Sequence, residues 1–257
     1  MARRARRLRY GHAPGQFGVL HEPHPSRTGG CVVVLVHGGF WRWPFNRWVM
    51  TLLVRDALRL GYTVFNIEYR RLGRWGGGGG YPETFDDVSA AVDLVVRRFP
   101  DSARFLVGHS AGGHLALVAA AGRGGEVDGV VALAAPCDLR RLSEAGSERV
   151  DELVRRAPVT QRWSLTSPIE MVPIGVPTVC VHGAADTTVR PQGAARFVRA
   201  ASDAGDDARF VLVPDERHRD ALRPSSTSWT TTMETIDRWH EMDAASRSAR
   251  PVTMDGS

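Results

Sequence analysis

A serine in this chain has the surroundings of an enzyme nucleophile. Ser110 is the central residue of GHSAG, residues 108–112, which joins an apolar, strand-like run to a helix-like run rich in Ala and Leu. In a strand, sharp turn and helix of this kind, small residues two before and two after the serine let both elements pass closely and leave the hydroxyl exposed at the turn. The pattern predicts that Ser110 is the nucleophile of an acyl-transfer site.

A histidine and an aspartate further along the chain can complete such a site. His218 follows a strand-like run that ends at Val213, and Asp186 follows another over residues 178–181. A histidine base needs a carboxylate on its far nitrogen, which fixes its tautomer and stabilises the imidazolium formed during reaction. We predict that Asp186 supplies that carboxylate and that His218 is the base. An aspartate just before a helix also suits a turn or an N-cap.

A glycine-rich stretch can supply the backbone donors that such a reaction needs. HGGFW, residues 37–41, directly follows the first strong strand-like run, and its glycines let the backbone turn inward. Backbone N–H groups stabilise the negative oxygen that forms when a serine attacks a carbonyl. We predict donors at Gly39 and Phe40, together with Ala111, the residue after the nucleophile. The same glycines also suit a simple tight turn.

Strand-like and helix-like runs alternate along the chain. Short apolar or β-branched runs predict strands, and apolar residues at helical spacing predict helices. The expected strands cover residues 31–36, 63–67, 104–107, 129–134, 178–181 and 209–213, and the expected helices cover 47–60, 84–98, 111–121, 193–204 and 230–242. This alternation predicts an α/β fold, with a mostly parallel, twisted sheet of about eight strands covered by helices on both faces. The motifs above then fall at the carboxyl ends of the strands, where ligands bind.

Residues 17–243 are expected to form a single domain. The charged, weakly amphipathic segment 137–172 lies between two predicted core strands and is expected to form a small helical cap over the site. An Arg-rich arm over residues 1–16 is expected to be flexible, and a polar tail over 244–257 to be disordered. Five glycines at 76–80 follow a strand and predict a mobile loop near the mouth of the site.

Charge and apolar content limit the classes of protein that this chain can be. The formal net charge is +5, and since the sequence contains no lysine, all of its positive side chains at neutral pH are arginines. The basic start lacks the interleaved aromatic residues of a nucleic-acid arm and the apolar segment of an export signal. No run approaches membrane-spanning length, and the three cysteines fit buried, reduced thiols. We expect a cytoplasmic monomer or homodimer that needs no cofactor or metal and binds neither nucleic acid nor membrane.

Four motifs together carry a family resemblance. HGGFW, EYR at 68–70, GHSAGGHLA at 108–116 and HGAAD at 182–186 resemble the α/β-hydrolase superfamily, and within it the small intracellular carboxylesterases and arylformamidases related to the hormone-sensitive-lipase group. The order Ser110, Asp186, His218 is the one that this fold uses. The resemblance implies hydrolysis of a small-molecule carboxylic ester or activated amide, such as an N-formyl arylamide, through an acyl-enzyme. Two alternatives stay open: an arylformamidase specific for N-formylkynurenine-like substrates, and a non-catalytic binding protein.

Aromatic residues near these motifs suggest a substrate pocket. Trp41, His109 and Trp163 are its expected walls, although tryptophan more often packs in a core. The cap segment also carries arginines that would favour a carboxylate-bearing substrate if they faced inward, while a solvated outer face is the simpler expectation. These arginines are Arg140, Arg141 and Arg162.

Overall fold

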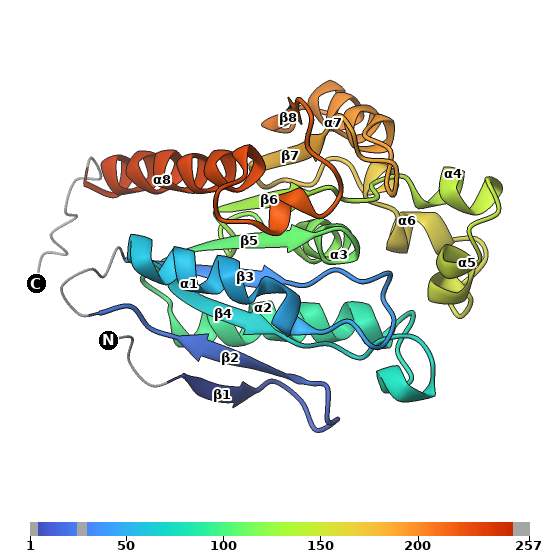
Figure 1. The fold of residues 1–257 in the computed structure, drawn as a ribbon, viewed down its shortest axis with the longest axis horizontal. Helices are drawn as coiled ribbons and strands as arrows, with labels where there is room; N and C mark the ends of the chain where they lie inside the picture. The colour runs from blue at the N-terminus through green and yellow to red at the C-terminus, as the bar shows by residue number, and fades with distance from the viewer. Residues whose placement is uncertain (1–4, 25–29, 249–257) are drawn as a thin grey trace, which may run out of the picture.

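An eight-stranded sheet forms the centre of the structure (Figure 1). The computed structural model describes residues 5–24 and 30–248, with only the backbone described for 243–248. The strands lie in the order β1-β2-β4-β3-β5-β6-β7-β8, and those from β3 to β8 are parallel. Their bounds are β1 Arg6–Arg9, β2 Phe17–His21, β3 Cys31–Val36, β4 Thr63–Ile67, β5 Ala103–His109, β6 Gly129–Leu133, β7 Thr178–Gly183 and β8 Ala208–Val213. The predicted mostly parallel sheet of about eight strands is confirmed.

Helices cover both faces of this sheet. The two faces follow from the alternation of side chains along a strand: in β3, Val32, Val34 and Val36 join one core cluster, while Cys31, Val33 and Leu35 join the other. The first cluster packs against α2 Glu83–Arg98, α3 Ala111–Ala120 and α7 Gln192–Asp203, and the second against α1 Thr51–Leu60 and α8 Thr227–Ser248. Because β3 is buried on both faces, its sequence is a continuous apolar run instead of an alternating one.

The helices present apolar stripes to these clusters. In α7, Ala194, Phe197, Val198 and Ala201 recur at helical spacing and are the buried residues of the helix. None of the helices in the described part of the chain has both the length and the apolar character that crossing a membrane requires.

Three short helices occupy the segment expected to form a cap. They are α4 Leu139–Glu144, α5 Glu148–Val154 and α6 Arg162–Thr166, and they lie together to one side of the sheet, at the right in Figure 1. Val150, Leu153 and Val154 of α5 are buried and belong to the core cluster that contains α2 and α3. We call residues 137–172 the cap segment below.

Both ends of the chain differ from expectation where the structure describes them. Residues 6–9, expected to lie in a flexible arm, form β1, which pairs antiparallel with β2. Leu8 packs against the core and the Arg7 guanidinium lies 3.6 Å from the centre of the Phe17 ring, so the strand is held although its composition is basic. Helix α8 continues to Ser248, so residues 244–248 of the expected tail are helical. Residues 1–4 and 249–257 lie outside the described residues.

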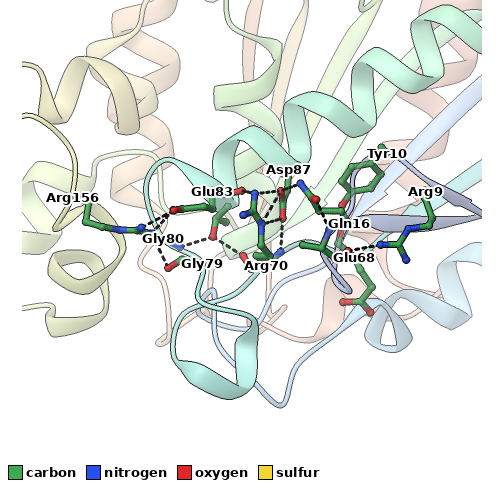
Figure 2. Close-up of polar contacts among 12 residues, drawn as sticks. Arg9, Tyr10, Gln16, Glu68, Arg70, Gly79, Gly80, Glu83, Asp87 and Arg156 are labelled. Carbon is green, nitrogen blue, oxygen red and sulfur yellow. Dashed lines mark hydrogen bonds and ion pairs between the residues drawn. The ribbon is translucent and has the colours of Figure 1, made fainter.

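A polar network ties the start of the chain to the glycine run and the cap segment (Figure 2). The fully buried carboxylate of Asp87 accepts from the Arg70 guanidinium at 2.6 Å and from the Gln16 amide at 2.7 Å. The Thr84 hydroxyl donates to the Arg70 carbonyl at 2.6 Å and accepts from the Gly80 N–H at 2.8 Å. Glu83, like Thr84 and Asp87, belongs to α2, and it pairs with Arg156 of the cap segment. Helix α2 therefore connects the glycine run with the cap segment.

Candidate active site

Ser110 lies at the turn between β5 and α3. Its backbone φ is 53° and ψ is −121°, a region that non-glycine residues rarely adopt, which is the strain expected of a sharp strand-to-helix turn. The neighbouring glycines make this turn sterically feasible. A Cβ on Gly108 would lie 2.2 Å from the Gly112 carbonyl oxygen, and a Cβ on Gly112 would lie 2.1 Å from that of Val36. The turn itself is anchored by a 2.7 Å hydrogen bond from the Ser110 N–H to the Leu133 carbonyl.

His218 bridges Ser110 and Asp186. Its Nε2 lies 2.9 Å from the Ser110 Oγ, and its Nδ1 lies 2.8 Å from the Asp186 Oδ2. Because an ionised carboxylate only accepts, the proton belongs on Nδ1, and Nε2 presents its lone pair to the serine hydroxyl. His218 sits on the loop after β8, Asp186 on the loop after β7, and Ser110 at the end of β5. Three parallel strands thus bring together residues separated by up to 108 positions in the chain.

Four donors surround the buried carboxylate of Asp186. Its Oδ1 accepts from the Thr188 N–H at 2.8 Å and the Val189 N–H at 3.0 Å. Its Oδ2 also faces the His182 Nε2 at 3.1 Å, and this nitrogen carries a proton since it bonds the Val189 carbonyl as well. Burial alone would raise the pKa of Asp186, but hydrogen bonds from His182, His218 and the Val189 N–H outweigh burial and lower it. The aspartate is therefore held ionised.

His109 supports the loop that carries His218 and does not line the pocket predicted for it. Its Nε2 lies 2.8 Å from the His218 carbonyl oxygen and donates to it. Burial, and next the proximity of His218, lower the pKa of His109 to about 3, so its ring is neutral near pH 7. The motif GHSAG placed His109 beside the serine, but gave no sign that the ring faces His218.

The HGGFW loop lies against the serine. Phe40 and Ala111 line the same cavity as Ser110, whereas Gly39 is not among its lining residues. The backbone turns through positive φ at Gly39, Phe40 and Trp41, at 121°, 54° and 56°. The Ala111 N–H belongs to the first turn of α3, where no carbonyl of the helix can accept from it. Two of the three residues predicted to supply donors, Phe40 and Ala111, thus line the same cavity as the candidate nucleophile.

Trp41 is held by a buried histidine. Its indole N–H donates to the His114 Nδ1 at 3.3 Å, and the His114 Nε2 donates to the Thr166 carbonyl of α6 at 2.7 Å. Burial lowers the pKa of His114 to about 4, which keeps the ring neutral with one donor and one acceptor nitrogen, as this chain of bonds requires. The HGGFW loop and the cap segment are therefore connected through α3.

A cavity of about 570 Å³ opens above Ser110, within the range of small-molecule sites. Of the three predicted walls, Trp41 lines it, while His109 and Trp163 do not. Trp163 packs against the core instead, because α6 turns its side chain toward the cluster of α2 and α3. The complete lining is Phe40, Trp41, Ser110, Ala111, Pro136, Cys137, Asp138, Arg141, Leu142, Ala145, Ser147, Arg149, Val150, Thr187, Thr188, Val189, Arg190, Gln192, Gly193 and Arg196.

The glycine run lies away from this cavity. Gly78 and Gly79 line a smaller cavity of about 340 Å³ together with Arg155 and Arg156. Among the described residues, no group of three or more His, Cys, Asp or Glu side chains is arranged to hold a metal ion.

Comparison with known proteins identifies the family. The sequence profile of the prolyl oligopeptidase family matches residues 71–242, which is more than half of the chain. The chain belongs to the prolyl oligopeptidase family. The matched region contains Ser110, Asp186 and His218, and the HGGFW loop lies before it. No curated protein matches the chain in sequence.

Solved structures of esterases share the fold. The chain aligns with a truncated carbohydrate esterase from gut microbiota at a TM-score of 0.78 and 18% identity, covering 94% of this chain and 96% of that one. It aligns with esterase B from Lactobacillus rhamnosis at 0.78 and 16% identity, covering 95% and 88%. It aligns with the esterase Est2 from Thermogutta terrifontis at 0.72 and 19% identity, covering 91% and 93%. The predicted α/β-hydrolase fold is confirmed. The family match and the fold together identify the chain as an α/β-hydrolase-fold serine hydrolase.

Proposed function

We propose that this protein hydrolyses carboxylic esters of small molecules, with Ser110 as the nucleophile, His218 as the base and Asp186 as the group that orients it. The observation that carries the proposal is the 2.9 Å contact between the Ser110 Oγ and the His218 Nε2, with Ser110 lining the cavity. A hydroxyl in that contact can lose its proton to the imidazole as it attacks a carbonyl.

The reaction has two halves. In the first, the Ser110 oxygen bonds to the carbonyl carbon while its proton moves to His218, and the negative oxygen is stabilised by the N–H groups of Ala111 and Phe40, with Gly39 as the further expected donor. Each such donor lowers the barrier by about 3 kcal/mol. His218 then gives its proton to the departing alcohol as the carbon–oxygen bond breaks. In the second half, water attacks the acyl-serine with His218 again as base, which releases the acid and restores the hydroxyl.

Cavity size and lining favour small substrates. A volume of about 570 Å³ suits a drug-sized molecule better than a long peptide. The aromatic wall formed by Phe40 and Trp41 also fits an aryl group, which keeps an N-formyl arylamide such as N-formylkynurenine as the second candidate. The family name points to prolyl peptides, which enter as a third substrate class in the test.

Initial rates on four substrates test the proposal. These are 4-nitrophenyl acetate, 4-nitrophenyl octanoate, N-formylkynurenine and a prolyl peptide 4-nitroanilide, each measured with the wild-type chain and with Ser110→Ala as blank. We expect the highest Ser110-dependent kcat/KM on an ester. Preference for the formamide by more than about a hundredfold, or about 3 kcal/mol, would instead make the protein an arylformamidase. No Ser110-dependent turnover on any substrate would refute the proposal and favour a binding protein.

A further inference from the structure

The cavity above Ser110 is lined by four arginines from separate segments. Arg141 comes from α4, Arg149 from α5, Arg190 from the loop before α7 and Arg196 from α7. A solvated outer face was the simpler expectation for Arg140, Arg141 and Arg162, and of these three only Arg141 lines the cavity; Arg140 pairs with Glu170 at 2.8 Å.

The lining contains a single acidic residue beside these four arginines. Asp138, the acidic residue of the lining, accepts from Arg196 at 2.9 Å and lies 3.7 Å from the Arg141 Nε. Its other oxygen is occupied by the Arg141 N–H at 3.2 Å. Both Asp138 oxygens thus already have partners, namely the Arg141 backbone N–H and the Arg196 guanidinium. Among described residues, no ion pair involves Arg149 or Arg190.

Arg149 is held at the cavity wall although it lacks an acidic partner. Its guanidinium lies 4.3 Å from the centre of the Phe40 ring, so it reaches from the cap segment to the loop beside the nucleophile. This contact leaves the N–H groups at the guanidinium edge available to a ligand, because stacking uses the face of the group.

The backbone adds to the positive character of the same cavity. Gln192 and Gly193, in the first turn of the 12-residue helix α7, belong to the lining, and no acidic residue lies in that turn. The exposed N–H groups of a first turn carry partial positive charge. Two unpaired guanidinium groups and this helix end make a potential that concentrates anions near Ser110.

The rest of the lining is apolar. Pro136, Leu142 and Val150 stand with the aromatic wall of Phe40 and Trp41. A ligand that matches the whole cavity therefore has an apolar body and an anionic end.

We propose that the preferred substrate is an ester that carries a negatively charged group, a carboxylate or a phosphate, and that Arg149 and Arg190 bind this group. The inference rests on the function proposed above and specifies its substrate class. Both guanidinium groups can pair with planar or tetrahedral oxyanions through two parallel N–H···O bonds, which fixes the orientation of the ester toward Ser110.

Matched pairs of esters test this inference. On the leaving-group side, 4-acetoxybenzoate and 4-acetoxyphenyl phosphate are compared with neutral methyl 4-acetoxybenzoate. On the acyl side, mono-4-nitrophenyl glutarate is compared with its neutral methyl ester. Each kcat/KM is divided by the hydroxide-catalysed rate constant of the same ester to remove differences in intrinsic reactivity. We expect a preference of about tenfold or more for the charged member of at least one pair, which added salt weakens.

The variants Arg149→Gln and Arg190→Gln identify the groups responsible. Each is expected to lower the charged-to-neutral preference by about tenfold. Because both residues are exposed, neither substitution should change the melting temperature, and thermal unfolding checks that the variants fold. Arg199→Gln is the matched control. Like the other two variants, it removes one positive charge, here from α7, but Arg199 is exposed and does not line the cavity. It should therefore leave the preference unchanged.

Each outcome has a distinct meaning. Ser110-dependent turnover without preference for a charged ester would overturn this inference and leave the proposed function standing. A preference that survives in both arginine variants would overturn the assignment of Arg149 and Arg190. Absence of Ser110-dependent turnover on every ester would overturn the proposed function and this inference together. The carboxylate and phosphate substrates, compared directly, identify which anion the cavity prefers.

Discussion

Replacing Asp186 with asparagine perturbs the hydrogen bonding of the candidate site without changing the size of the side chain. The Asp186 Oδ1 accepts from two backbone N–H groups, at Thr188 and Val189, which can only donate. The single oxygen of an asparagine must therefore stay on that side, and its NH₂ group takes the place of Oδ2. This places a donor opposite the His218 Nδ1.

The consequence is a change of tautomer at His218. Facing an NH₂ group, Nδ1 must become an acceptor, so the proton moves to Nε2, which lies 2.9 Å from the Ser110 Oγ. A protonated Nε2 cannot take the serine proton, and we expect kcat to fall by about 10⁴-fold. The second donor, the His182 Nε2, keeps its proton for the Val189 carbonyl and meets the NH₂ group unfavourably. We expect a loss of about 2 kcal/mol in the free energy of unfolding.

Two measurements check this reasoning. The first is kcat of Asp186→Asn on 4-nitrophenyl acetate, with Ser110→Ala as blank, and the second is urea unfolding of the same variant. Asp215→Asn is the matched control: Asp215 is exposed on the loop that carries His218, and its φ of 60° suits asparagine, so both quantities should stay at wild-type values. A kcat of Asp186→Asn within tenfold of wild type would refute the tautomer argument.

Three further predictions concern stability. Gly112→Ala should lower the free energy of unfolding by about 3 kcal/mol, because its Cβ would meet the Val36 carbonyl, whereas Gly193→Ala, in open space within α7, should not destabilise; equal effects in urea unfolding would contradict this. Below pH 6.5 the unfolded chain protonates His114 while the folded chain, with a pKa of about 4, does not. The free energy of unfolding should therefore fall by up to about 1.4 kcal/mol per pH unit as the pH drops from 6.5 to 4, and His114→Gln should make that fall less steep. An equally steep fall in the variant would contradict the role given to His114. Asp87→Ala should lower the free energy of unfolding by about 3 kcal/mol, because it leaves Arg70 without its partner. Asp93→Ala should cost far less, since the Asp93 carboxylate is 42% exposed. Similar losses for the two variants in denaturant unfolding would contradict the importance of the buried network.

The central elements were predictable because their signals are local. A short, continuous apolar run such as β3 is typical of a strand that is buried on both faces of a sheet. The carboxyl ends of parallel strands lie along the same edge of the sheet, so motifs that follow these strands lie close together. This is why Ser110, Asp186 and His218, chosen by position after strands, lie in contact. β1 was missed because its four residues include three arginines, and its stability comes from pairing with β2 rather than from its composition.

The walls of the cavity were not predictable in the same way. Which side of a short helix faces a cavity depends on how that helix packs, and the cap helices have five to seven residues each, too few for a clear apolar stripe. Arg149 and Arg155 look alike in the sequence, yet Arg149 lines the cavity above Ser110 and Arg155 lines the smaller one. Trp163 was expected in the pocket and packs on the core for the same reason.

In the mechanism that we propose, the histidines around the candidate site have separate roles, either in positioning or in proton transfer. His109 donates to the carbonyl of His218, and His182 donates to the carboxylate that also accepts from His218, so the proposed base is held through its backbone and through its carboxylate partner. A positioning imidazole is useful only if it does not gain a proton and repel the imidazolium formed at His218 during reaction. Burial prevents this at His109, because it lowers the pKa of the His109 ring to about 3 and so keeps that ring neutral near pH 7. In the proposed mechanism, desolvation of His109 thus keeps a second positive charge away from the imidazolium of His218.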